Sequence, residues 1–136
     1  HTVTVSLLLP YPGLQIISGN EADPWLTETQ FMPWDYMQRQ PQPVQKKLYI
    51  RSSLGAVTGR LLEPAQLGGD AGSLPLTVKL GSYELTTSPQ TLLTASQAHE
   101  GVTLEVLISA SPNQGDHYKP GRYRGVVNML FELSAP

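Results

Sequence analysis

The start of the chain alternates between polar and apolar residues with a period of two, from Thr2 to Leu9. Its polar positions are Thr2, Thr4 and Ser6, and its apolar positions are Val3, Val5, Leu7 and Leu9. Successive side chains of a β-strand point to opposite faces, so this pattern predicts a half-buried strand. Pro10, Pro12 and Gly13 then end the strand, because both residue types favour turns. We therefore expect an N-terminal arm, residues 1–10, followed by one domain, residues 11–136.

The same alternation recurs along the chain and predicts further short strands. They are expected at 14–17, 47–51, 57–62, 74–80, 83–86, 102–110 and 123–133, with a short one within 29–38. Gly81-Ser82 predicts the turn of a hairpin, whereas residues 64–73 and 111–120 have the composition of loops. No segment predicts a helix. About seven or eight short strands with turns between them indicate an all-β sandwich.

Length, charge and composition narrow the class of protein. The 136 residues suit a single domain, and the net charge of −2 argues against a nucleic-acid binder, which would carry a basic patch. The chain has no cysteine, so disulfides, thiol chemistry and cysteine-based zinc sites are excluded. No apolar run is long enough to predict a transmembrane helix. The start at His1 fits either a mature form after signal cleavage or a trimmed chain.

Catalytic and cofactor chemistry finds little support in the sequence. The histidines, His1, His99 and His117, are far apart and lie at a terminus or in predicted loops. Metal ligands normally cluster at fixed spacings, and these do not. The glycine-rich stretch 68–72 precedes no Lys-Ser/Thr pair and no predicted helix, so it indicates a turn rather than a phosphate loop. A small β-rich enzyme would need a convergent polar cluster. We therefore expect a protein that is not an enzyme and binds no metal or cofactor.

Aromatic residues concentrate in a proline-rich stretch, residues 23–44. They are Trp25, Phe31, Trp34 and Tyr36. In one interpretation the rings cover an end of the sandwich, which is the usual role of aromatic residues because each buries about 150–250 Å². In the other, Trp25 and Trp34 form a stacking platform for a sugar, and the protein is a carbohydrate-binding β-sandwich module. The sequence leaves both interpretations open.

The last predicted strand and two central segments carry motifs beyond simple alternation. Residues 120–131 read Pro-Gly-Arg-Tyr-Arg-Gly-Val-Val-Asn-Met-Leu-Phe, with the pattern Gly-x-Tyr-x-Gly-x-Val. Residues 74–88 contain Pro-Leu-Thr-Val followed by Leu-Thr-Thr-Ser, and residues 57–65 read Val-Thr-Gly-Arg-Leu-Leu-Glu-Pro-Ala. Together with the proline-ended arm, these segments resemble, in order, the pilin subunits of chaperone–usher fimbriae, of the class 5 or alpha-clade major pilin type.

The resemblance implies an immunoglobulin-like sandwich that lacks one strand and is completed by donor-strand complementation. A periplasmic chaperone first supplies the missing strand, and the N-terminal arm of a neighbouring subunit replaces it at the outer-membrane usher. The implied protein is exported through the periplasm and forms an adhesive fimbria on the cell surface, where a host-surface receptor is a further implied partner. A minor adhesin subunit that uses Trp25 and Trp34 is the alternative within this family.

Elementary physics gives the implied roles to particular residues. A sandwich that lacks a strand exposes an apolar groove and unpaired backbone groups, which accept an added strand. The inserted side chains would be Val3, Val5, Leu7 and Leu9. The groove wall would be formed by Val127, Met129, Phe131 and Leu133. Such head-to-tail contacts do not close on themselves and so grow a filament. The other interpretation of the arm is an ordinary first strand in the sheet of its own chain.

Overall fold

A computed structural model describes residues 1–9, 11–69, 72–110 and 122–134 of the chain. The predicted turn at 111–120, and Pro10 at the end of the predicted arm, lie outside these residues. The strands of the first half are β1 Thr2–Leu8, β2 Leu14–Ser18, β3 Gln30–Phe31, β4 Trp34–Asp35, β5 Gln40–Pro41, β6 Val44–Ser52 and β7 Val57–Leu61. Those of the second half are β8 Gln66–Gly69, β9 Gly72–Leu80, β10 Tyr83–Glu84, β11 Gln90–Leu93, β12 Val102–Ala110 and β13 Tyr123–Leu133. Two short helices, η1 Trp25–Thr27 and α1 Ala95–Glu100, complete the described elements.

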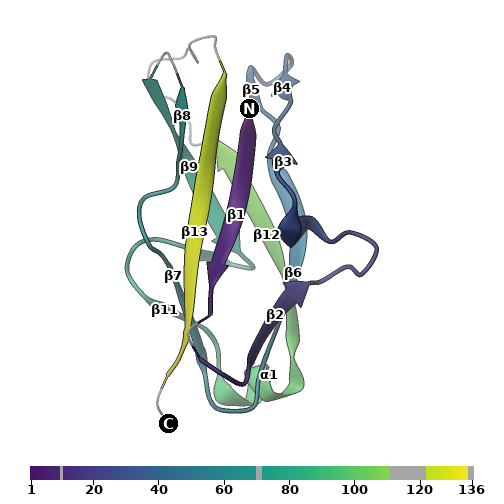
Figure 1. Ribbon diagram of the computed structural model, residues 1–136, viewed down its shortest axis with the longest axis vertical. Coiled ribbons are helices and arrows are strands. Elements are labelled where there is room, and N and C mark those ends of the chain that lie inside the picture. Colours follow the sequence, from purple (N-terminus) through teal and green to yellow (C-terminus); the bar gives the residue numbers. More distant parts are fainter. Residues whose placement is uncertain (10, 70–71, 111–121, 135–136) are drawn as a thin grey trace.

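The strands form the two layers of an immunoglobulin-like sandwich (Figure 1). In one layer β13 has β7 and β8 on one edge and β1 on the other, with β11 beyond β7. In the second layer the order is β2, β6, β12, β9, β10. Strand β9 belongs to both layers, because its first half pairs with β8 and its second half with β12. The all-β fold class is therefore confirmed.

The core lies between the layers and is filled by the apolar positions of the alternating strands. Along the long strands β6, β9 and β12 the buried residues fall on alternate positions, as the sequence pattern predicts. The fully buried residues include Leu48, Ile50, Val78, Ile108, Met129 and Phe131. Strand β13 matches its expected bounds and contributes Val127, Met129 and Phe131 to this core. This strand is therefore both the centre of its layer and one wall of the site described below.

The segment expected to be a loop, residues 64–73, is corrected by the structure. It contains β8, and β9 already begins at Gly72. Leu67 is fully buried and pairs with Leu74, which anchors the segment to the sheet. A side chain at Gly69 would collide with the backbone of Arg122, so the glycine marks a close approach of two strands. Glycine, which suggested a turn, here permits pairing.

The expectation of a chain without helices is also corrected. Helix α1 begins after Thr94, whose side chain accepts a hydrogen bond from the Gln97 backbone N–H at 3.2 Å. The Gln97 side chain in turn accepts a bond from the Thr94 N–H at 2.9 Å, which completes a capping box. Gly101 ends the helix with φ +87°, a conformation that favours glycine. The proline-rich stretch holds a second departure, the single turn η1.

Candidate functional site

Strand β1 lies along the edge of β13 within its own chain (Figure 1). The two strands run parallel, with Val5 opposite Val127 and Leu7 opposite Met129. Val3 and Val5 are at most 5% exposed, and Val127 and Met129 at most 1%. The structure therefore brings predicted donor residues and predicted groove residues into direct register. We call the trough beside β13 that β1 occupies the arm groove, and residues 1–9 are the described part of the arm.

The remaining predicted site residues lie beyond that register. The parallel ladder ends where Leu8 faces Leu130, so Phe131 and Leu133 pair with β7 instead, opposite Gly59 and Val57. Phe131 is fully buried in the core, and Leu133 packs against the core while partly exposed. Leu9 follows the end of β1 and is 36% exposed. These three residues therefore flank the arm groove rather than pair across it.

The second edge of β1 is only partly covered. Among the described residues, β3 pairs with this edge at Thr2 and Val3 alone, next to a bond from the Met32 N–H to the His1 carbonyl of 2.8 Å. Further along β1, an open hollow of about 610 Å³ separates the arm from β2 and η1. It is lined by Thr4, Val5, Ser6, Leu7, Ile16, Ile17, Ser18, Pro24, Leu26 and Thr27. The arm therefore occupies the groove without filling it.

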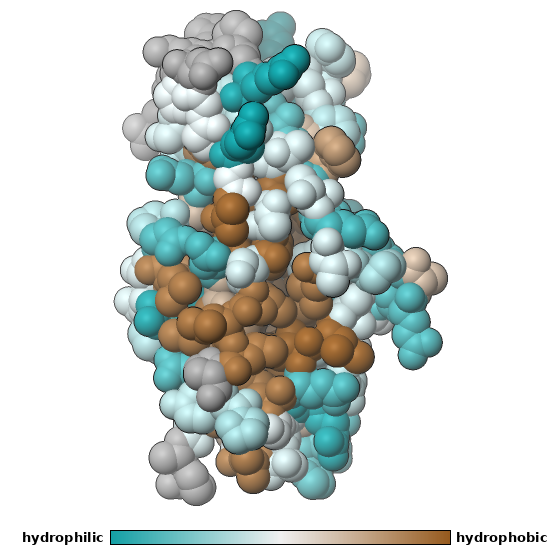
Figure 2. Space-filling model, in the orientation of Figure 1, coloured by the Kyte–Doolittle hydropathy of each residue, from teal (hydrophilic) through white to brown (hydrophobic). Residues whose placement is uncertain are grey.

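Apolar surface surrounds the part of the arm groove that β1 leaves uncovered. Figure 2 shows hydrophobic residues gathered on the middle and lower part of the face that carries β1 and β13. Leu8 and Val126 are each 50% exposed, and Ile17 is 45% exposed. Contiguous exposed apolar surface commonly marks an interaction site. Ile16 and Leu26 were not among the predicted site residues, although a short strand was predicted at 14–17.

A family model identifies the family to which this chain belongs. Residues 2–132 match the family model described as CS1 type fimbrial major subunit. The chain belongs to this family of fimbrial subunits. The fold also matches the structure of the CooA pilin subunit from enterotoxigenic Escherichia coli, with a TM-score of 0.65 and 10% sequence identity. That match covers 90% of this chain and 99% of the CooA chain. A search of curated proteins finds no match.

Family membership defines the general role of this fimbrial subunit. It is a structural component of a surface pilus, and it polymerises with other pilin subunits. In the described part of the chain, no helix is long and apolar enough to cross a membrane. The same residues contain no group of three histidine or carboxylate side chains placed to hold a metal ion. The site itself offers a partly uncovered edge of β1 and exposed apolar side chains.

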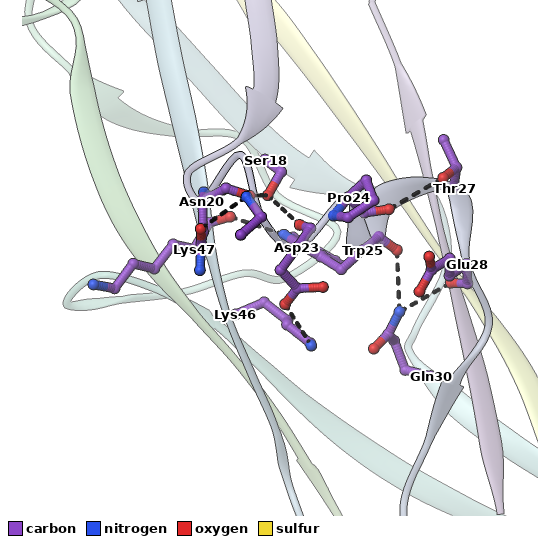
Figure 3. A network of polar contacts seen from close by, with 11 residues as sticks. Ser18, Asn20, Asp23, Pro24, Trp25, Thr27, Glu28, Gln30, Lys46 and Lys47 are labelled. Atoms are coloured by element: carbon purple, nitrogen blue, oxygen red, sulfur yellow. Dashed lines mark hydrogen bonds and ion pairs between the residues drawn. The ribbon is translucent and has the colours of Figure 1, made fainter.

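The two tryptophans of the fimbrial subunit occupy different environments. Trp25 is 1% exposed, and its indole N–H donates a 2.8 Å hydrogen bond to the carbonyl of Lys47 (Figure 3). Gln30 donates a bond to the Trp25 carbonyl at 3.0 Å, so backbone and side chain are both fixed. A ring without an exposed face cannot stack on a sugar. Trp34 is half-buried, with its ring 6.4 Å from that of His1. The structure thus favours packing as the role of Trp25.

Replacing Trp25 with alanine is expected to lower the free energy of unfolding by about 3–5 kcal/mol, because a large buried ring leaves a cavity. Trp34→Ala is the matched control and is expected to cost about 1 kcal/mol, since this ring is already partly in water. Urea unfolding followed by circular dichroism measures both changes. Equal losses for the two variants would contradict the assignment of Trp25 to the core.

Proposed function

We propose that this fimbrial subunit polymerises by donating its arm to the arm groove of another copy. The observation that carries the proposal is the incomplete closure of the groove by the chain's own arm. Beyond Val3, the second edge of β1 faces the 610 Å³ hollow instead of a strand among the described residues. Unpaired backbone and half-covered apolar side chains are costly, so a placement that covers more of them is favoured. An arm seated in a neighbour can provide such a placement.

The direction of insertion follows from where the arm leaves its domain. Thr2 lies at one end of the sandwich, here called the upper end, and the connection from Leu8 to Leu14 lies at the other, the lower end (Figure 1). An arm inserted parallel to β13 would place the lower ends of donor and acceptor together. That arrangement favours a reciprocal swap between two copies, which closes on itself. Antiparallel insertion instead places the lower end of the donor at the upper end of the acceptor, and the contact repeats indefinitely.

The proposal extends to the partners that act before polymerisation. A groove that awaits an arm exposes apolar side chains and strand edges, which are prone to aggregation. We therefore assign the subunit a periplasmic chaperone that covers the groove and an outer-membrane usher where the arm replaces the chaperone. Export through the periplasm to a surface fimbria follows from these partners. The role is structural and non-enzymatic, and attachment to a host surface is the purpose of the fibre.

A synthetic peptide with the sequence of residues 1–9 tests arm donation. Added in excess to the full-length subunit, the peptide is expected to occupy free grooves and stop polymer growth, as measured by the size distribution on a sizing column. The control peptide carries Val5→Asp, which places a carboxylate at a position that is 5% exposed when bound. Growth that continues equally with both peptides would show that the arm does not connect the subunits.

A further inference from the structure

A hairpin at the upper end of the sandwich presents two large side chains to solvent. Strands β4 and β5 pair through Trp34–Pro41 and Asp35–Gln40, and the loop between them carries Tyr36 and Met37. Tyr36 is 85% exposed and Met37 is 90% exposed. Aromatic residues and methionine are enriched in protein interfaces, where they supply much of the binding energy. This exposed pair, here called the hairpin tip, therefore indicates an interaction surface.

The loop is held in a defined shape. The Asp35 carboxylate accepts hydrogen bonds from the backbone N–H groups of Met37 and Gln38, at 2.9 and 3.1 Å. Below the loop, the Gln42 N–H donates a 2.7 Å bond to the carbonyl of Pro33. A loop already ordered in this way loses little conformational entropy when it binds. The hairpin tip is therefore a preorganised apolar projection.

An exposed apolar site also lies at the lower end. The turn between β6 and β7 carries Leu54, which is 58% exposed. A side chain at Gly13 would lie 2.8 Å from a methyl group of Leu54, so this leucine borders the chain that leads out of the arm. Tyr11, in the same connection, is 39% exposed. Tyr11, Gly13 and Leu54 form what we call the lower patch.

We infer that the hairpin tip binds the lower patch of the next copy of this chain in the fibre. The inference rests on the proposed arm donation. Antiparallel insertion brings the Leu8 end of the donor arm to the upper end of the acceptor, where β1 begins and where β3, β4 and β5 lie (Figure 1). The ring contacts of His1 with Trp34 and Tyr123 place the hairpin base directly beside that end of the groove. The lower patch is carried there by the donor arm itself.

This contact has the properties that a fibre with two different ends needs. It joins two different surfaces of identical subunits, so it repeats without closing. It also couples to arm donation, because a donor arm seated in the groove raises the local concentration of the lower patch at the hairpin tip. The hairpin tip would then set the angle between successive subunits, whereas the arm supplies the connection.

Two single-cysteine variants, Met37→Cys and Leu54→Cys, test the contact. Because the natural chain has no cysteine, any disulfide in a mixed fibre must join different copies. Oxidation of fibres grown from a mixture of the two variants is expected to give a dimer. A disulfide between position 37 of one copy and position 54 of the next would link its two chains. The matched control pairs Met37→Cys with Tyr83→Cys, which places the second thiol on β10, at a residue that is also exposed, by 40%. All three substituted positions are exposed, so folding should be retained.

The outcomes separate this contact from arm donation. Dimer well above the control level, with no dimer from either variant alone, supports the contact. If the fibres sediment normally but give dimer only at the control level, the hairpin tip does not bind the lower patch. Arm donation is then unaffected. Dimers formed by Leu54→Cys alone overturn it as well, since they indicate that lower ends meet. Failure of the natural chain to form fibres overturns both proposals together.

Discussion

Replacing Val5 with aspartate is expected to abolish fibre growth. Val5 lies opposite Val127 and is 5% exposed, so its side chain is among the most deeply inserted of the arm. Burial of a valine side chain contributes about 1.5–3 kcal/mol, and an unpaired buried carboxylate costs several kcal/mol more. Even a loss of about 3 kcal/mol weakens binding by about a hundredfold. Electron microscopy and sedimentation should show no fibres. Leu7→Asp is expected to have the same effect.

Ser6→Asp is the matched control, because Ser6 lies on the same arm but faces outward and is exposed. This variant is expected to form fibres of normal length. Mixing the Val5→Asp subunit with the natural subunit distinguishes a loss of arm donation from a loss of folding. A folded Val5→Asp subunit keeps its arm groove but cannot donate, so a small fraction of it should shorten fibres of the natural chain by ending them. Normal fibre lengths from the pure Val5→Asp subunit would contradict the role of the arm.

Strand positions were predictable where the polar–apolar alternation was long and turn residues such as glycine and proline bounded it. Strand β13 spans the expected residues, because eleven residues with every second side chain inward leave little choice of register. Helix α1 has only six residues, too few for a helical period to appear, and its capping box was the one readable signal. Strand β8 was missed because its two glycines indicate a turn unless the neighbouring strand is known.

The residues that face each other across the site could be predicted, but the direction and register of the arm could not. Alternation assigns Val3, Val5 and Leu7 to one face, and this assignment is the same whether the arm runs parallel or antiparallel to β13. Direction, register and the identity of the acceptor chain depend on tertiary geometry that no local pattern encodes. The aromatic stretch shows the same limit. Trp25 and Trp34 each follow a proline, yet the structure buries Trp25, in the turn η1, and leaves Trp34 half-buried.

The direction of the arm gives the last prediction, which uses two cysteine pairs that share one partner. In the chain's own groove Ser6 faces Asn128, and Thr4 faces Val126. The pair Ser6→Cys with Asn128→Cys is therefore expected to form a disulfide within one chain, because directly opposed residues have the required separation. The lock should hold the subunit as a monomer on a sizing column. Reduction should restore polymerisation.

An antiparallel arm that covers the same stretch of β13, with Val5 again opposite Val127, would bring Thr4 opposite Asn128. The pair Thr4→Cys with Asn128→Cys is therefore expected to form disulfides between chains, visible as a ladder of multimers on a non-reducing gel. Both pairs lose the bond from Asn128 to Glu63, so this loss cannot distinguish them. A ladder from the Ser6 pair with none from the Thr4 pair would contradict antiparallel donation, because the arm would then keep its direction when it changes chains.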